Sequence, residues 1–225
     1  MEGSQALFSI FGLEVSSVIT TMWGIMLVIA LMSFFSTRNL DKLPLTRWQN
    51  FIEYGIEAIL GILAQGMGSE KNARRFFPLL ASFFIMILAS NLSGLLPGSG
   101  HIPGLQAPTS TLSVTAAFAI VVFFATHYLG FREKGWRYFK FLIKPYFFMI
   151  PLNLVEQFVR PLSLSLRLFG NIFGDETVVA IFVSIAPIFI PIPMMFLSMM
   201  FGLIQAFIFT LLASIYLNEA ISEEH

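Results

Sequence analysis

The stretch VSSVITTMWGIMLVIALMSFFS, residues 15–36, runs for 22 residues without a charged side chain. At 1.5 Å per residue, a helix of this length crosses a hydrocarbon core about 30 Å thick. The rest of the chain has the same character, because 56% of its 225 residues are hydrophobic and only 12% are charged. So few polar residues cannot cover a water-soluble globule. The sequence therefore predicts an integral membrane protein.

Outward from this stretch, the sequence predicts an all-α membrane protein with a single membrane domain, residues 1–225. Segment 46–66 places its isoleucines and leucines on one helical face and its acidic residues on another, which is typical of an interfacial amphipathic helix. The last two helices are long enough to be strongly tilted, and prolines 187, 191 and 193 mark the turn of a hairpin between them. Five membrane-embedded helices are expected, at 15–36, 76–97, 110–131, 146–186 and 193–219.

Basic residues are concentrated in two loops. Eleven of the 13 lysines and arginines lie in segments 37–75 and 131–145, whereas the N-terminus and segment 98–109 have none. By the positive-inside rule, the two basic loops are cytoplasmic, the N-terminus is outside and the C-terminus is inside. The first 16 residues contain no lysine or arginine, so no cleaved signal or transit peptide is expected. A bacterial plasma membrane is the predicted location, with a thylakoid membrane as the alternative.

Several classes of chemistry lack the residues they need. The chain has no cysteine, and its three histidines, His101, His127 and His225, lie in separate regions without metal-ligand spacing. No glycine-rich phosphate loop is present, and no histidine is placed to activate Ser163 or Ser165. We therefore expect no catalytic activity of its own, no metal, no cofactor and no nucleic-acid partner. An intramembrane protease or lipid transferase is disfavoured on the same grounds.

The two remaining basic residues, Arg160 and Arg167, lie inside the fourth hydrophobic helix, in FVRPLSLSLRLFGNIFGDET, residues 158–177. An arginine at the centre of a membrane helix costs roughly 2.5–3.5 kcal/mol, so it needs a polar partner, a cavity or a function. Arg160 has a structural explanation, since it can pair with Glu156 one turn earlier or reach the interface. At 100° per residue, Glu176 falls about 180° from Arg167. This helix is therefore expected to have two polar faces.

The run RPLSLSLRLFGN, residues 160–171, resembles the signature of subunit a of the F-type ATP synthases. Agreement continues in SNLSGLLP at 90–97, APT at 107–109 and GLIQAFIF at 202–209, with Tyr216 near the C-terminus. The resemblance covers roughly residues 45–220 and is closer to the chloroplast and cyanobacterial branch than to the enterobacterial one. It implies an ion-translocating stator subunit that couples proton flow through two aqueous half-channels to rotation of a c-ring and to ATP synthesis.

The resemblance also implies the roles of individual residues. Arg167 would be the stator arginine that faces the c-ring carboxylates, and Asn91 would lie near one channel entrance. Some family members have a histidine or an acid where this chain has Ser198, so the path there would depend on water, Glu176 and hydroxyl groups. The implied proton path is formed by Asn91, Asn171, Asp175, Glu176, Ser198 and Gln205.

The expected partners are the c-ring, the peripheral-stalk b subunits, the rest of the ATP synthase and the lipid bilayer. Protons are the expected coupling ion, and sodium is the alternative. An independent ion channel or secondary transporter is the competing class, in which an arginine stripe would bind an anion or gate a pore. Such a protein would be active alone, whereas a stator subunit requires its rotor.

Overall fold

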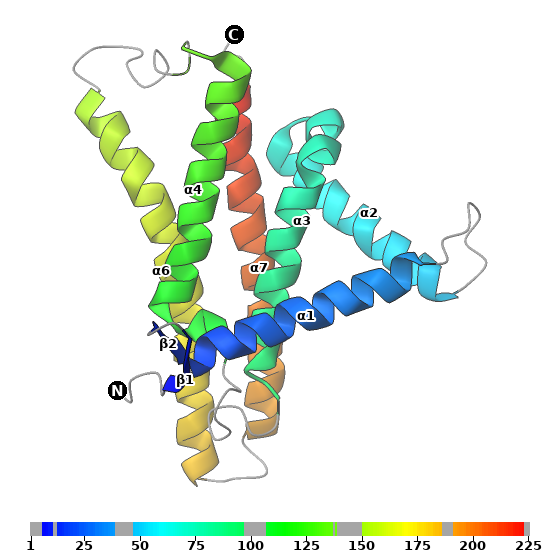
Figure 1. Cartoon of the computed structure of the whole chain (residues 1–225), viewed down its shortest axis with the longest axis vertical. Helices are drawn as coiled ribbons and strands as arrows, with labels where there is room; N and C mark the ends of the chain where they lie inside the picture. Colours follow the sequence, from blue (N-terminus) through cyan, green and yellow to red (C-terminus); the bar gives the residue numbers. More distant parts are fainter. Residues whose placement is uncertain are drawn as a thin grey trace.

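This computed structural model describes residues 6–10, 13–38, 47–96, 107–136, 138, 150–185 and 191–222. The described residues contain six α-helices (Figure 1). Five of them are long and apolar enough to cross a membrane, and the exception is α2. The predicted helical membrane architecture is thus confirmed. The helices are α1 (Ser17–Thr37), α2 (Arg47–Met67), α3 (Glu70–Ser93), α4 (Leu112–Lys134), α6 (Ile150–Ile185) and α7 (Pro191–Ile221).

Two features near the helix ends were not expected from the sequence. Strands β1 (Ala6–Ile10) and β2 (Leu13–Ser16) form a short antiparallel hairpin before α1. A 3-10 turn, η1 (Pro108–Ser110), precedes α4. Of the three prolines expected at the turn between the last helices, Pro191 begins α7, which suits its fixed φ and missing N–H, and Pro187 lies outside the described residues.

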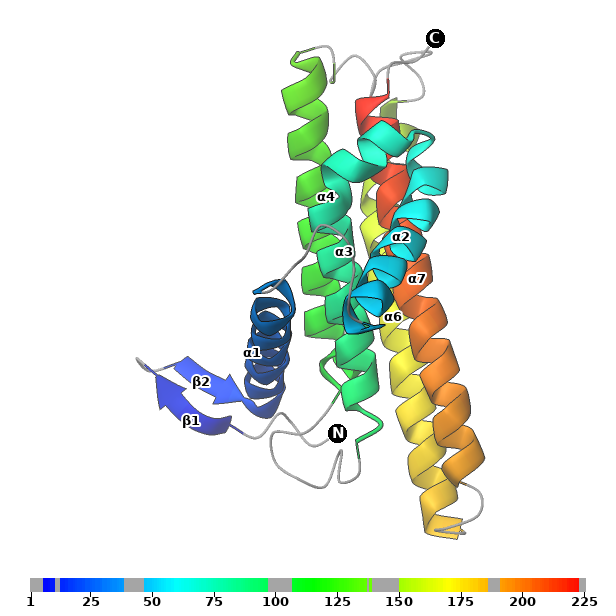
Figure 2. The same ribbon diagram turned by 90° about the vertical axis from the view of Figure 1, so that its right-hand side faces the viewer.

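Helices α3, α4, α6 and α7 run side by side as a bundle (Figures 1 and 2). Three phenylalanine rings meet where α3, α4 and α7 adjoin: Phe83, Phe118 and Phe209, with centroids 6.1–6.4 Å apart. Such edge-to-face and tilted ring pairs stabilise a contact beyond the area they bury. Around the rings, the core is formed by fully buried side chains including Leu63, Met67, Leu80, Ile87, Leu164, Leu168 and Leu217.

Helix α2 packs against α3 and α7, and a glycine permits the contact. A Cβ atom added at Gly66 would lie 1.9 Å from Ser214 Oγ and 3.2 Å from Ser214 Cβ on α7. Real Cβ atoms do not approach this closely, so a larger residue at position 66 would force the Ser214 side chain to move. The amphipathic helix is therefore fixed to the bundle by its C-terminal end.

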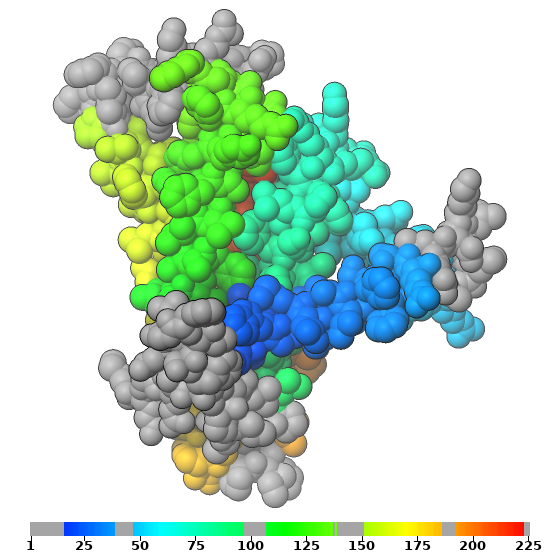
Figure 3. All heavy atoms as spheres, in the orientation of Figure 1, coloured from blue at the N-terminus to red at the C-terminus, as the bar shows by residue number. Residues whose placement is uncertain are grey.

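Helix α1 runs across the bundle and not along it (Figures 1 and 3). Only residues of its first turns, Ser17, Val18 and Thr21, are buried. The rest of α1 exposes large apolar side chains, such as Leu27 and Phe35, which suits contact with lipid.

We predict that Gly66→Val weakens the docking of α2, because the added side chain overlaps Ser214. Overpacking of this kind typically costs about 1–3 kcal/mol. The matched control is Gly61→Val on the same helix, where a Cβ atom meets nothing within 4 Å. Thermal unfolding of the purified variants checks this, and equal melting temperatures for both would contradict the role of Gly66.

Candidate functional site

The two arginines of α6 have different surroundings. Arg160 is partly buried, with its Nη2 atom 2.6 Å from Glu156 Oε1 and its Nη1 atom paired with Glu219 Oε2 of α7. Its guanidinium also lies 5.0 Å from the ring centroid of Tyr216, in a cation–π contact. The predicted pairing with Glu156 is confirmed. Arg160 thus connects α6 to α7, and the carboxylates of Glu156 and Glu219 compensate its charge.

Arg167, two turns further along α6, is exposed. Within the described residues it forms no ion pair. About 100–140° around the helix from Arg167, the exposed side chains Leu162, Leu166 and Phe173 form an apolar face. A permanent positive charge therefore projects from the surface of a membrane helix, beside an apolar face.

One turn beyond Arg167, an amide pair joins α6 to α7. Asn171 Nδ2 donates to Gln205 Oε1 at 2.7 Å. Gln205 is only 2% exposed, and its Nε2 atom is buried without a hydrogen-bond partner in the described part of the chain. A buried donor of this kind costs roughly 1–3 kcal/mol unless it is satisfied, so the site favours an ordered water or another polar ligand.

A cavity of about 620 Å³ lies beyond this amide pair, on the side away from Arg167. Asn91, Asp175, Glu176 and Ser198, four of the residues implied by the resemblance, line it together. Asp175 Oδ2 is buried and unpartnered within the described residues, which again favours water in this space. The carboxylate of Glu176 lies close to Gly94, where an added Cβ atom would be 3.1 Å from Oε1. The cavity thus brings two carboxylates together at one end of the helix hairpin.

Asn91 has a structural role in the cavity wall. Its Nδ2 atom donates to the carbonyl of Gly202 on α7 at 2.9 Å, and its Oδ1 atom accepts from Thr109 Oγ1 at 2.7 Å. Asn91 and Thr109 are both buried. The pair therefore joins α3, η1 and α7, which fixes the position of the wall. The resemblance did not assign a role to Thr109.

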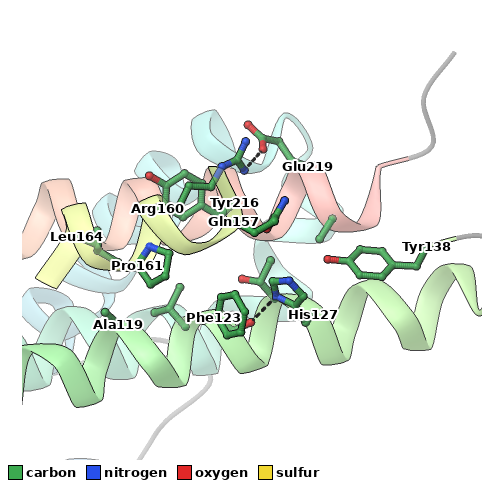
Figure 4. Close-up of a pocket in the computed structure, with 13 residues that line it drawn as sticks. Ala119, Phe123, His127, Tyr138, Gln157, Arg160, Pro161, Leu164, Tyr216 and Glu219 are labelled. Carbon is green, nitrogen blue, oxygen red and sulfur yellow. Dashed lines mark hydrogen bonds and ion pairs between the residues drawn. The ribbon is translucent and has the colours of Figure 1, made fainter. Parts of the chain in front are cut away.

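A second cavity, about 30 Å³ and large enough for a water molecule, lies at the Arg160 end of α6 (Figure 4). Arg160, Glu219, Gln157 and His127 line it, as does Tyr138, whose pKa is raised because the phenol is buried. His127 Nδ1 lies 2.8 Å from the carbonyl oxygen of Phe123. Sequence reasoning missed Glu219, although it is the only acid within the last predicted helix.

The predicted site residues therefore fall into three groups. Asn91, Asp175, Glu176 and Ser198 share the larger cavity, Asn171 and Gln205 form the amide pair, and Arg167 projects from the surface. Among the described residues, no cluster of three histidine, aspartate or glutamate side chains could hold a metal ion.

Comparison with known proteins identifies the family. The family model for the ATP synthase A chain matches residues 19–218. ATP synthase subunit a of Trichlorobacter lovleyi is 39% identical over 225 residues, which cover 98% of this chain and 94% of that protein. ATP synthase subunit a of Moorella thermoacetica is 40% identical over 212 residues, covering 94% and 93%. ATP synthase subunit a 2 of Bradyrhizobium sp. BTAi1 is 39% identical over 219 residues, covering 97% and 94%. The chain belongs to the ATP synthase A chain family, the membrane-embedded subunit a of the bacterial enzyme.

Proposed function

We propose that this chain is the proton-conducting stator subunit, and that Arg167 faces the carboxylates of a rotating c-ring. The observation that carries the proposal is a charged, exposed side chain without an ion pair in the described residues, on a membrane helix and beside its apolar face. A cost of roughly 2.5–3.5 kcal/mol for an arginine at this depth favours a counter-charge from another subunit. A rotor carboxylate supplies that charge.

The chemistry of such a carboxylate explains why arginine is needed. A c-ring carboxylate that crosses lipid must be protonated, because a bare carboxylate is too costly to bury. Beside a guanidinium its pKa falls, so it releases the proton when it reaches the stator. Arginine remains protonated when desolvated, whereas a buried lysine can lose its proton. The apolar face beside Arg167 lowers the local dielectric constant when it meets lipid or another apolar surface, and this strengthens the attraction.

The larger cavity is proposed as one half-channel. Its carboxylates, Asp175 and Glu176, accept protons from water, and the Ser198 hydroxyl adds a further polar contact. Glu176 is nine residues from Arg167, which is about 13 Å along the helix. The Asn171–Gln205 amide pair lies between them and cannot titrate, so we assign it the positioning of water along this interval.

The smaller cavity is proposed as the second half-channel, with Glu219 as its carboxylate. Arg160 lines the smaller cavity and Glu176 lines the larger one. The two residues are about 24 Å apart along α6, and Arg167 lies near the midpoint. A fixed positive charge between two offset cavities repels a proton that would pass directly. Rotation of the ring is then the conductive route, and each charge crossing 100 mV supplies about 2.3 kcal/mol.

The proposed orientation follows the distribution of basic residues. Arg132 and Lys134 end α4 on the side of the smaller cavity, so the positive-inside rule makes that cavity cytoplasmic. The larger cavity then opens to the outside, and the N-terminus is outside as well. The c-ring and the b subunits are the proposed partners, and protons are the proposed coupling ion.

Thiol accessibility tests the larger cavity, since the chain has no native cysteine. We predict that Ser198→Cys reacts with a membrane-impermeant thiol reagent and that the modification blocks proton pumping. The control is Ser214→Cys, because Ser214 is 0% exposed and lies in the contact between α2 and α7. Equal reactivity of the two thiols would argue against a water-filled cavity at Ser198.

ATP-driven acidification of inverted vesicles tests Arg167. We predict that Arg167→Ala abolishes pumping, with or without sodium, because rotor carboxylates no longer ionise at the stator. Arg74→Ala serves as the control, since Arg74 is exposed and, in the described part of the chain, pairs with Glu70 one turn earlier on its own helix. Normal pumping by Arg167→Ala would overturn the assignment of Arg167 as the stator arginine.

A further inference from the structure

An open apolar groove of about 330 Å³ lies away from both proposed half-channels, where the end of α1 meets the start of α2. Figure 1 shows these two helix ends converging on one side of the molecule. The volume is in the range of small-molecule sites. The groove is lined by Val28, Leu31, Met32, Phe35, Ser36 and Trp48.

One end of this groove is polar. Trp48 Nε1 donates to Ser36 Oγ at 3.4 Å, and the indole stacks on Phe51 with a centroid distance of 6.2 Å. Tryptophan is enriched at the level of lipid headgroups, because its ring is apolar and its N–H is polar. The α1 side of the groove has only large apolar side chains before Ser36. The groove is therefore apolar along α1, which suits an acyl chain, and polar at Ser36 and Trp48, which suits a lipid headgroup.

Two arginines flank the polar end. Arg38 directly follows α1, and Arg47 begins α2, so each lies within two residues of the Ser36–Trp48 hydrogen bond. Both are exposed, and within the described residues neither forms an ion pair. The first turn of α2 contains no acid. The link between the helices has one acid, Asp41, and one base, Lys42, which cancel in charge.

We propose that this groove binds one anionic phospholipid, with an acyl chain along the α1 side and the phosphate between Arg38 and Arg47. Arginine forms strong, often bidentate hydrogen bonds to phosphate oxygens. A helix of another subunit could fill the apolar part, but an apolar helix would leave both arginines without a counter-charge. The positive charges of Arg38 and Arg47 therefore favour an anionic lipid as the occupant of the groove.

Photolabelling of the intact, purified ATP synthase tests the site. Phosphatidylglycerol and phosphatidylcholine, each with a diazirine on one acyl chain, are reconstituted with the complex, and labelled peptides of this chain are mapped. We expect phosphatidylglycerol to label residues 28–36 and 48–51 in excess, since each arginine near the surface favours anionic lipid by about fivefold. Equal labelling by both lipids would mean ordinary boundary lipid and would overturn the proposal. Absence of labelling by either lipid would mean that another subunit covers the groove, which also overturns it.

Matched variants separate a specific site from the general charge of the surface. We expect Arg38→Gln/Arg47→Gln to reduce phosphatidylglycerol labelling to the phosphatidylcholine level, and Arg38→Lys/Arg47→Lys to restore part of the excess. The control is Arg132→Gln, an exposed basic residue at the end of α4. An equal loss in Arg132→Gln would show that surface charge alone sets the preference. Because proton pumping is measured separately, failure of this proposal leaves the proposed function untouched.

Discussion

The charge of Arg167 projects from α6 beside an apolar face, and within the described residues nothing neutralises it. Its unfavourable exposure to hydrocarbon, roughly 2.5–3.5 kcal/mol, would have to be offset by a partner subunit. Arg160 shows the contrast on the same helix, because Glu156 and Glu219 compensate its charge inside the chain. One arginine thus strengthens the fold, and the other is left available for an external carboxylate.

The remaining architecture supports that one exposed charge. The hydrogen bonds of Asn91 fix the position of α3, η1 and α7 at the larger cavity. Gly66 allows α2 to pack closely against α7. The unpaired atoms, Gln205 Nε2 and Asp175 Oδ2, lie on the proposed route between the cavity and Arg167. Unsatisfied polar atoms reduce stability, so their presence here favours bound water at these positions.

Much of this fold was predictable because long apolar runs and one amphipathic pattern define its helices. The β1–β2 hairpin was missed, since strands of five and four residues leave no periodicity that separates them from a loop. The crossing of α1 over the bundle depends on tertiary packing that no single segment encodes. Resemblance to a family indicated Glu176 and Gln205, whereas the Arg160–Glu219 pair joins residues 59 positions apart and required the structure.

The central claim is that the exposed surface of α6 at Arg167, together with the adjacent apolar face that includes Leu166, adjoins the rotor. A photo-crosslinking amino acid at Leu166, which is 48% exposed next to Arg167, tests it directly in the intact enzyme. The same amino acid at Leu27 of α1, which is 61% exposed, is the control. The account predicts that Leu166 crosslinks to c subunits, that Leu27 does not, and that the Leu166 crosslink stops ATP-driven rotation. Crosslinks from Leu166 to lipid or to a stator subunit alone would contradict it.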